Sequence, residues 1–296
     1  MPDHSGKEMN EMGLSLEKVS YVYEQGTAME TAALKDVSLE IPDNQFIGLI
    51  GHTGSGKSTL VQLLNGLLRP SSGSVLYNGK DIHADGFDKK ALRANVGLVF
   101  QYPEHQLFEV DVLSDVMYGP RNLGLDEAVC KKRAVQALEN VGISEKYFKT
   151  SPFDLSGGQK RRAAIAGVLA MNPKVLILDE PTAGLDPKGR DEILGLISEM
   201  KKKLSMTIIL VSHSMDDVAR YVERIVVMGH GEKVFDDSPK NVFRHYTELE
   251  ELGLSAPQIT YIMNTLRESG LDVETDALTV EEAAEEIMRS ISKSSR

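Results

Sequence analysis

The chain has 296 residues, of which 41% are hydrophobic and 26% are charged, so it can build the core of a soluble domain with a small appendage. Its 33 basic and 44 acidic side chains give a formal charge of −11, which weighs against a role on nucleic acid. The single cysteine, Cys130, excludes an intramolecular disulfide framework and fits a reducing cytoplasm.

The chain shows no targeting or membrane-spanning segment in its sequence. No stretch approaches the roughly 18 consecutive apolar residues of a spanning helix. Residues 1–13 are polar and lack the apolar core of an export signal, so we expect a flexible lead-in.

The expected elements begin with β-structure and continue as a doubly wound core. Residues 14–23 and 33–41 alternate in the manner of antiparallel strands. Short runs rich in Val, Ile and Leu follow, and such runs suit a parallel sheet covered on both faces. These runs are residues 46–50, 96–100, 175–178, 208–211 and 225–228. Helical patterns separate them, so the sequence predicts an α/β fold with a mostly parallel core sheet.

Two further regions are expected to be helical. Residues 111–150 read as consecutive helices inserted between two core strands. In residues 248–296, Ile259, Ile262, Met263 and Leu266 mark one apolar face of a helix, opened by Ser255 as cap and Pro257 in the first turn. A second, acidic helix is expected over residues 280–290. This tail either packs on the core or contacts another protein, and we expect residues 248–296 to form a small helical dimerisation region.

A P-loop follows the strand at residues 46–50 and opens a helix. Its residues are Gly51, His52, Thr53, Gly54, Ser55, Gly56, Lys57 and Ser58. The glycines let backbone N–H groups curl around a phosphate chain, and the helix N-terminus adds a partial positive charge. Lys57 can bridge the terminal phosphates, and the Ser58 hydroxyl can bind Mg²⁺.

Two adjacent carboxylates end the apolar run at residues 175–178. Asp179 can hold Mg²⁺, and Glu180 can polarise a water toward the γ-phosphate. Adjacent acids at a strand end can also be solvated turn residues. The P-loop in the same chain favours the catalytic interpretation.

Residues 155–159 read Leu-Ser-Gly-Gly-Gln directly before a helix. This pentapeptide is similar to the signature sequence of the ABC ATPase family. The resemblance implies that the signature crosses to a partner subunit and holds the γ-phosphate of ATP seated on the partner's P-loop. The signature residues acting on the partner site would be Ser156, Gly157, Gly158 and Gln159.

Other elements that resemble this family appear in the expected order. Gln101 looks like the Q-loop glutamine that senses Mg²⁺ and the attacking water. Residues 183–186 resemble the D-loop, with Asp186 linking the two sites, and His213 looks like the switch histidine at the γ-phosphate. Tyr23 is placed like the aromatic residue that stacks on adenine. The resemblance covers roughly residues 14–245, with the ATPase domain expected over 14–247.

The resemblance therefore implies three sets of site residues. The catalytic residues would be Glu180, His213 and Gln101. The ATP-binding residues would be Tyr23, Gly51, His52, Thr53, Gly54, Ser55, Gly56, Lys57, Ser58 and Thr59. The Mg²⁺ ligands would be Ser58, Gln101 and Asp179, with Mg²⁺ as the cofactor.

The segment 100–108, Phe-Gln-Tyr-Pro-Glu-His-Gln-Leu-Phe, looks like the extended Q-loop of energy-coupling factor (ECF) importers, and the tail is similar to theirs. Glu104 and His105 can instead belong to a polar loop without contacts. The resemblance implies a peripheral ATPase on the cytoplasmic face of the membrane. Its partners would be a second ATPase (identical or a sister chain), an integral membrane scaffold and a substrate-capturing membrane subunit for vitamins or transition-metal ions. It leaves the transported substrate open.

Several other functions compete with this interpretation. The main alternative is an ATPase subunit of another class of ABC transporter. A non-transport ABC ATPase of DNA repair would be expected to show a long coiled-coil insertion or a basic face, and a translation-type protein would carry two P-loops. An ATP-binding regulator would lack Glu180 or His213, and both are present.

Overall fold

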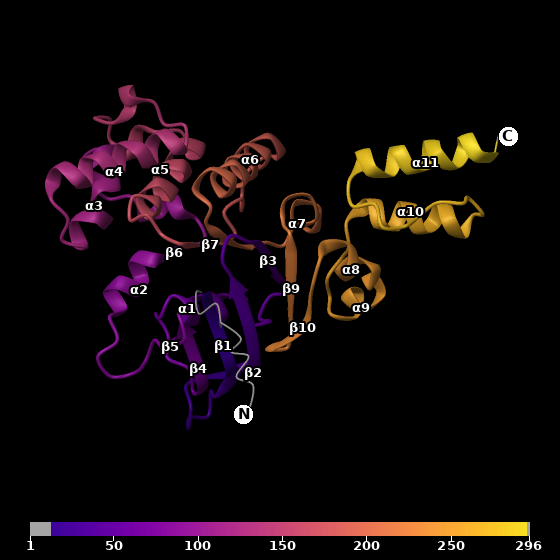
Figure 1. Cartoon of the computed structure of the whole chain (residues 1–296), viewed down its shortest axis with the longest axis horizontal. Helices are drawn as coiled ribbons and strands as arrows, with labels where there is room; N and C mark the ends of the chain where they lie inside the picture. Colours follow the sequence, from indigo (N-terminus) through magenta and orange to yellow (C-terminus); the bar gives the residue numbers. More distant parts are fainter. Residues whose placement is uncertain (1–12, 295–296) are drawn as a thin grey trace, which may run out of the picture.

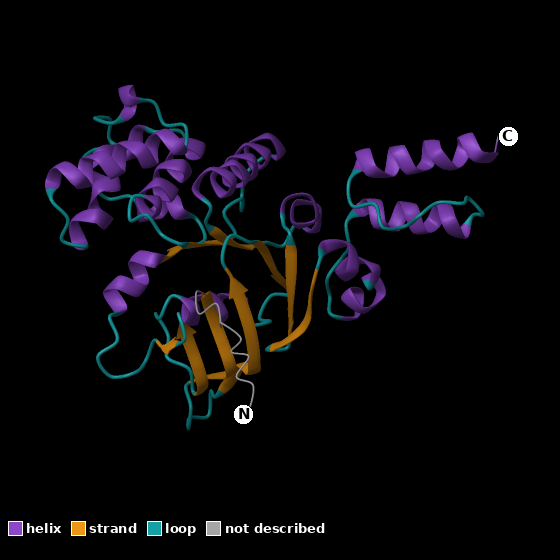
Figure 2. Ribbon diagram, in the orientation of Figure 1, coloured by secondary structure: helices purple, strands orange, loops and turns teal. Residues whose placement is uncertain are grey.

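The computed structural model describes residues 13–294 and contains two sheets (Figures 1 and 2). The first is antiparallel, in the order β2-β1-β4-β5. Its strands are β1 (Gly13–Tyr23), β2 (Thr31–Pro42), β4 (Ser72–Tyr77) and β5 (Lys80–Asp81). The expected lead-in at residues 1–12 lies outside the described residues, while Gly13 already belongs to β1.

The second sheet is the core, in the order β10-β9-β3-β8-β7-β6. All neighbouring pairs are parallel except β10 and β9. Its strands are β3 (Phe46–Gly51), β6 (Val96–Val99), β7 (Val175–Asp179), β8 (Thr207–Val211), β9 (Arg224–Gly229) and β10 (Glu232–Asp237). The predicted mostly parallel core is therefore confirmed, with β10 as an antiparallel edge.

Alternate residues of each core strand enter two different apolar clusters, because successive side chains point to opposite faces of a sheet. Phe46 and Ile50 of β3 join the cluster on the helical side, and Ile47 and Leu49 join the cluster formed with the antiparallel sheet. The helices that flank the core sheet include α1 (Lys57–Leu64), α2 (Lys89–Asn95), α6 (Pro187–Leu204) and α7 (Met215–Tyr221). Burial on both faces explains why these strands are almost continuously apolar.

The helical insert lies on one side of the core (magenta in Figure 1). It contains α3 (Val112–Asn122), α4 (Glu127–Asn140) and the short turns Glu145–Tyr147 and Pro152–Asp154, and it packs against α5 (Gly157–Leu169). Asp111 begins α3 by accepting a hydrogen bond from the backbone N–H of Ser114 at 2.8 Å, as an N-cap does.

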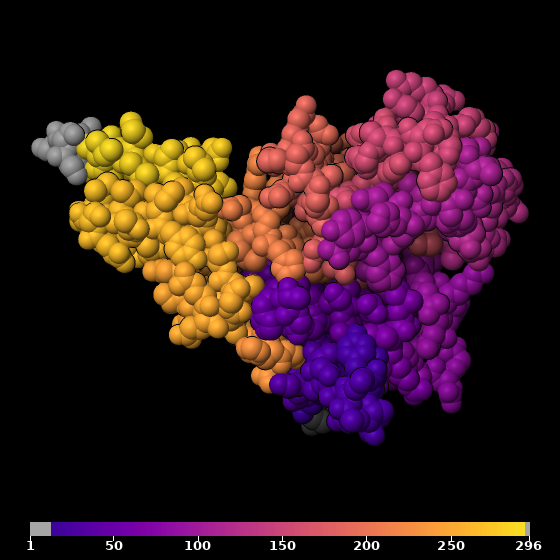
Figure 3. Space-filling model, turned by 180° about the vertical axis from the view of Figure 1, so that it is seen from behind, coloured from indigo at the N-terminus to yellow at the C-terminus, as the bar shows by residue number. Residues whose placement is uncertain are grey.

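The C-terminal end forms α8 (Pro239–Arg244), α9 (Tyr246–Glu251), α10 (Gln258–Glu268) and α11 (Val280–Ser294). The division expected at residue 248 falls inside α9, and Leu249, Leu254 and Ala256 are buried in the main core. A separate apolar cluster starts only with α10, around Met263. Helices α10 and α11 form a lobe at the end of the molecule opposite the insert (Figures 1 and 3).

The predicted start of α10 is wrong, because the helix begins two residues later than Ser255 as cap would imply. Ser255 does not cap it, and Pro257 occupies the N-cap position before Gln258, not the first turn. The apolar stripe is also divided. Met263 is buried, whereas the side chain of Ile262 is 50% exposed. Over residues 13–294, we find no helix of the length and apolar character that a membrane crossing requires.

Candidate active site

Four loops that carry predicted site residues meet at one edge of the core sheet. The neighbouring parallel strands β3, β8, β7 and β6 end at this edge. Gly51 ends β3, Gln101 follows β6, Glu180 follows β7 and His213 follows β8. The carboxyl edge of an open α/β sheet is where ligands bind, because the strand-to-helix loops gather there.

The P-loop encloses the ammonium group of Lys57. This group donates to the carbonyl oxygens of Gly51 at 2.6 Å and His52 at 3.0 Å. Gly56 has φ +101°, and a Cβ there would lie 2.6 Å from the carbonyl oxygen of Ala33, so the turn requires glycine. The buried hydroxyl of Ser55 has no hydrogen-bond partner. The loop thus surrounds an ammonium group that a phosphate could bind, while the Ser55 hydroxyl stays enclosed within the loop.

Glu180 links the loops after three different strands. Its Oε2 accepts a hydrogen bond from Nε2 of Gln101 at 2.9 Å, and its Oε1 lies 2.8 Å from Nε2 of His213. Glu180 has φ +50°, a left-handed backbone conformation that costs energy for a residue with a side chain. Strain of this kind concentrates at functional sites, and here it directs the carboxylate between Gln101 and His213.

Charges in this edge of the sheet are partly desolvated. Burial lowers the pKa of Lys57, while the carboxylates of Glu180 and Asp179 oppose the shift. Burial raises the pKa of Asp179, and the charge of Glu180 raises it further, against the effects of Lys57 and His213. A bound polyphosphate would favour the charged form of Lys57, and a cation would favour the ionised form of Asp179.

The structure brings together two of the three residues predicted to hold Mg²⁺. Ser58 hydrogen-bonds to the carboxylate of Asp179, and Gln101 lies on the adjoining loop at Glu180. Hydroxyl, carboxylate and amide oxygens are the ligand types that Mg²⁺ prefers, with phosphate and water oxygens completing its shell. The donor set therefore fits this ion.

Comparison with known proteins assigns the family. The ABC transporter family profile matches residues 34–183. An energy-coupling factor transporter ATP-binding protein of Caldanaerobacter subterraneus subsp. tengcongensis is 54% identical over 278 residues, covering 94% of this chain and 97% of the relative. The chain belongs to the ABC transporter family. Within it, the chain is an ATPase of the energy-coupling factor type.

Solved structures agree with this assignment of the fold. cbiO1 from Clostridium perfringens, part of the ABC transporter complex cbiONQ, matches with a TM-score of 0.72 at 42% identity, over 85% of this chain and 98% of that one. A dimeric ATP-binding cassette in a post-hydrolysis state with ADP and Pi matches with a TM-score of 0.67 at 28% identity, over 76% of this chain and 98% of that one.

Tyr23, the residue expected to stack on adenine, lies at the end of β1 in this ABC ATPase. Its hydroxyl lies 3.0 Å from Oγ1 of Thr59 on α1, and its ring, 39% exposed, packs edge-on against Tyr21. His52 lies beside His230, with ring centroids 4.8 Å apart. The partly exposed Tyr23 ring can therefore receive a base next to the P-loop.

The signature of this ABC ATPase lies apart from its own P-loop. Ser156 caps α5 in a reciprocal capping box with Gln159, and Asp186 caps α6 by accepting a hydrogen bond from Gly189. Across residues 13–294, no hydrogen bond or ion pair joins Ser156–Gln159 to Gly51–Thr59. Within one chain, the described residues thus show no such bond between the signature and the P-loop.

Arg161 is a residue that the sequence reasoning missed. It lies on α5 two residues after the signature, is only 3% exposed, and forms an ion pair with Glu104 at 2.7 Å. Glu104 is thus not a polar loop residue without contacts, and His105 stacks on Tyr102. The signal in the sequence was a charged residue on a helix face whose other residues are small and apolar.

Proposed function

We propose that this chain hydrolyses ATP as one of two ATPase subunits in an ECF-type importer. The observation that carries the proposal is the meeting of Gln101, Glu180 and His213 beside Lys57 and Asp179. Together with 54% identity to an ECF transporter ATP-binding protein, this arrangement supports hydrolysis coupled to transport.

In this proposal, each site residue has a distinct task in phosphoryl transfer, which needs positioning and charge neutralisation more than covalent chemistry. The two carboxylate oxygens of Glu180 now face Gln101 and His213, and one of these oxygens polarises the attacking water. Lys57 leaves the carbonyls of Gly51 and His52 to bind the β- and γ-phosphates. Mg²⁺, held by Ser58, Asp179 and Gln101, would neutralise charge on the phosphate oxygens.

The complete site is shared between two chains. Ser156–Gln159 of one subunit would close over the ATP on the P-loop of the other, with Asp186 at the contact. The capping box supports this role, because it fixes the start of α5 with the helix N-terminus and its backbone N–H groups directed outward. ATP would then favour the closed pair, and hydrolysis would release it.

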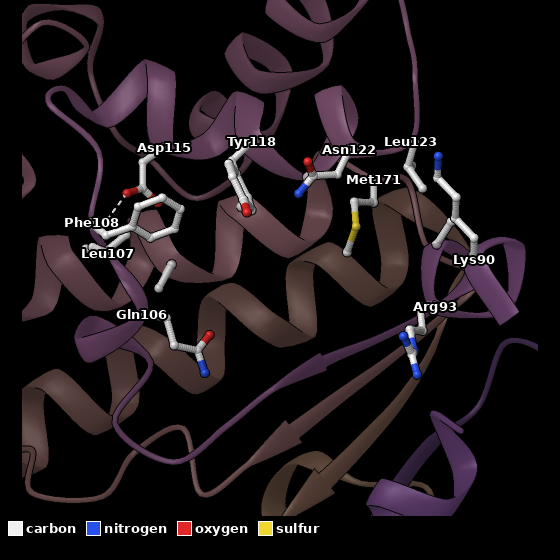
Figure 4. Close-up of a pocket in the computed structure, with 14 residues that line it drawn as sticks. Lys90, Arg93, Gln106, Leu107, Phe108, Asp115, Tyr118, Asn122, Leu123 and Met171 are labelled. Atoms are coloured by element: carbon white, nitrogen blue, oxygen red, sulfur yellow. Dashed lines mark hydrogen bonds between the residues drawn. The ribbon is translucent and has the colours of Figure 1, made fainter. Parts of the chain in front are cut away.

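A groove between the core and the insert is the proposed docking site for a helix of the membrane scaffold. Its volume is about 500 Å³. It lies between α2, α3, α5 and the segment that contains Gln106, and Figure 4 shows Lys90 and Arg93 at one end and Phe108 and Tyr118 toward the other.

The side chains of the groove suit an amphipathic helix. Leu107 and Met171 give it apolar walls, and the exposed ring of Phe108 packs edge-on against Tyr118. Asp115 fixes the loop by accepting hydrogen bonds from the backbone N–H of Phe108 at 2.8 Å and of Glu109 at 2.9 Å. One segment therefore runs from Gln101, beside the expected ATP, to Phe108 in the groove. This continuity supports an occupant that responds to hydrolysis.

The chain also has expected partners and an expected position at the membrane. The chain would sit at the cytoplasmic face of the membrane as a peripheral subunit, and residues 257–296 would help to pair it with a second ATPase, identical or a sister chain. A membrane subunit would capture the substrate, a vitamin or a transition-metal ion.

The test is purification of the tagged chain from cells that contain its membrane partners, followed by reconstitution in proteoliposomes. We expect integral membrane proteins to co-purify and substrate uptake to require ATP, with Lys57→Ala as the inactive control. An active ATPase pair that purifies without any membrane protein would contradict the importer function and favour a non-transport ABC ATPase. Uptake or export of another substrate class would favour a different ABC transporter.

A further inference from the structure

The guanidinium group of Arg161 is the centre of a buried polar cluster. Its Nε donates to Oε2 of Glu104 at 3.1 Å, and one terminal nitrogen donates to Oε1 of the same carboxylate at 2.7 Å. The other terminal nitrogen donates to the carbonyl oxygens of Pro181 at 3.0 Å and Ala183 at 2.9 Å. These four hydrogen bonds involve all three nitrogens and four of the five N–H groups of the planar fork.

These bonds join three segments with different tasks in the proposed ATPase. Arg161 lies on the signature helix, which acts on the partner's ATP. Glu104 lies between Gln101 at the chain's own ATP and the groove residue Gln106. Pro181 and Ala183 directly follow Glu180 and lead into Asp186.

Burying the ion pair between Arg161 and Glu104 removes two charges from water, which costs free energy that an apolar contact would not. Burial by itself would raise the pKa of Glu104, but the hydrogen bond and charge of Arg161 outweigh it and hold the pKa below its ordinary value. Apolar residues of similar size often stabilise a core as well as a buried ion pair does. The arrangement therefore points to a need for fixed geometry between the three segments.

We propose that Arg161 is a positioning residue that makes the signature helix, the loop at Glu104 and the backbone after Glu180 move as one unit. ATP bound between two subunits then changes the position of the groove, and an occupant of the groove changes the position of Glu180. The inference rests on the proposed function, because it assigns a coupling route to that same site. Lysine cannot replace Arg161, because its single ammonium group cannot hold both carboxylate oxygens and both carbonyls in one plane.

The test compares two variants with a matched control in the full-length, assembled transporter. Glu104→Gln is isosteric and leaves the bonds of Arg161 to Pro181 and Ala183 in place, and Arg161→Lys keeps the charge. The control is Glu127→Gln, which breaks the exposed two-bond ion pair between Glu127 and Arg121 in the insert.

The first readout is hydrogen exchange of the backbone amides of residues 101–108 with and without ATP, in the Glu180→Gln background. We expect ATP to slow this exchange in the parent and in the control. In Arg161→Lys and Glu104→Gln the ATP-dependent difference should fall about 5-fold or more, the size of a typical coupling between sites. The dissociation constant for ATP should stay within about 2-fold, since neither residue contacts the nucleotide.

The second readout, with Glu180 intact, is the amount of substrate transported per ATP hydrolysed, which should also fall about 5-fold or more in the two variants. A role in folding alone would raise exchange equally with and without ATP and leave this ratio unchanged. An ATP response in Arg161→Lys and Glu104→Gln equal to that of the parent would overturn the proposal. Failure of the parent itself to transport would contradict the importer function, while the exchange measurement would still decide the role of Arg161.

Discussion

Oε1 of Glu180 lies 2.8 Å from Nε2 of His213, although 33 positions separate the two residues in the chain. The contact arises because β7 and β8 are adjacent parallel strands that end at the same edge. Together with the hydrogen bond from Gln101, it holds the carboxylate of Glu180 in one orientation before any substrate arrives. Such fixed orientation is what a group that polarises a water molecule requires.

Glu180→Gln should therefore abolish most turnover and leave ATP binding intact. The amide retains an oxygen for Gln101, but it cannot polarise water as the carboxylate does. We expect a loss of about 10²–10⁴-fold in the ATPase rate of the assembled complex. The variant should also accumulate as a closed, ATP-bound pair in size-exclusion chromatography. Turnover near the wild-type rate would remove Glu180 from the mechanism.

Ser156→Arg should act on the partner's site. A bulky cation at the start of α5 would block the γ-phosphate of ATP on the other chain, while its own P-loop still binds nucleotide. Mixing Ser156→Arg chains with Lys57→Ala chains gives one composite site with both defects and one with neither, so ATPase activity should partly return.

The control for this experiment is Ser156→Ala. It loses the same N-cap, which is worth about 1 kcal/mol, without adding bulk. Full activity of each mutant chain by itself would contradict a shared site.

The sequence was sufficient for the P-loop and for the central strands, since these are apolar on both faces and end in polar loops. It did not reveal β10, because this edge strand reads Glu-Lys-Val-Phe-Asp-Asp and is only half-buried. An edge strand with charged side chains lacks the apolar pattern on which strand prediction depends.

The ion pair between Arg161 and Glu104 was also beyond prediction from sequence. The two residues are 57 positions apart and meet only after the helix of the signature packs against the loop that follows β6. The start of α10 was misplaced for a local reason. Ser255 and Pro257 both favour a helix start, and the chain uses Pro257 as the N-cap.

Gly167→Leu should fill the groove without disturbing the fold. A Cβ at Gly167 would meet no atom within 4 Å, and the residue lies in the interior of α5. Leucine favours a helix over glycine by up to about 1 kcal/mol, so the isolated chain should be equally stable or more so. We expect co-purification with the membrane scaffold to weaken at least about 10-fold, while ATP binding is unchanged.

Gly195→Leu on α6 is the matched control, because a Cβ there also meets no atom within 4 Å and α6 does not line the groove. Equal recovery of membrane proteins with Gly167→Leu and Gly195→Leu would show that the scaffold binds elsewhere.

Asp236→Asn tests an ion-pair cluster that ties the core sheet to β2. Asp236 accepts hydrogen bonds from Arg224 at 2.6 and 2.8 Å and from Lys233 at 2.8 Å, and Arg224 also donates to the carbonyl oxygen of Glu40. Loss of this partly buried charge should lower the free energy of unfolding by about 2 kcal/mol at pH 7, measured by urea denaturation. Asp191→Asn, which breaks an exposed pair with Arg220, should change it by less than about 1 kcal/mol.

The pH dependence of this difference has a definite sign. Burial alone would raise the pKa of Asp236, but Arg224 and Lys233 outweigh it and hold the pKa below its ordinary value. The stabilisation is therefore fully present above the unfolded value of about 4 and is lost as the pH falls through the lower folded value. The wild type and Asp236→Asn should differ by a constant amount between about pH 5 and 8 and should converge in stronger acid. A difference that grows with acid would rule out this explanation.

Truncation after Ala256 tests whether the C-terminal lobe holds two ATPases together. The cut must spare Leu249, Leu254 and Ala256, because these residues are buried in the main core, and a cut at residue 248 would expose that core. Removal of residues 257–296 breaks the exposed ion pairs of Lys240 with Asp276 and Glu282 and of Arg244 with Asp276. It also removes Tyr261 and Leu278, which are only partly buried where they pack against the main core. We expect the truncated chain to fold and bind ATP.

Pairing without nucleotide should weaken in the truncated chain, whereas ATP-dependent closure in the Glu180→Gln background should persist, both measured by analytical ultracentrifugation.

The apolar side chains of Ile262 and Met288 are 50% and 63% exposed on the lobe, and covering one such side chain contributes about 1.4 kcal/mol. Ile262→Asp and Met288→Asp should then each weaken nucleotide-free pairing about 10-fold. Val234→Asp, at a 42% exposed position on β10, is the control and should leave pairing unchanged. If the truncated chain pairs as tightly as the full chain in the absence of nucleotide, the lobe only completes the fold, and the membrane scaffold must hold the open pair together.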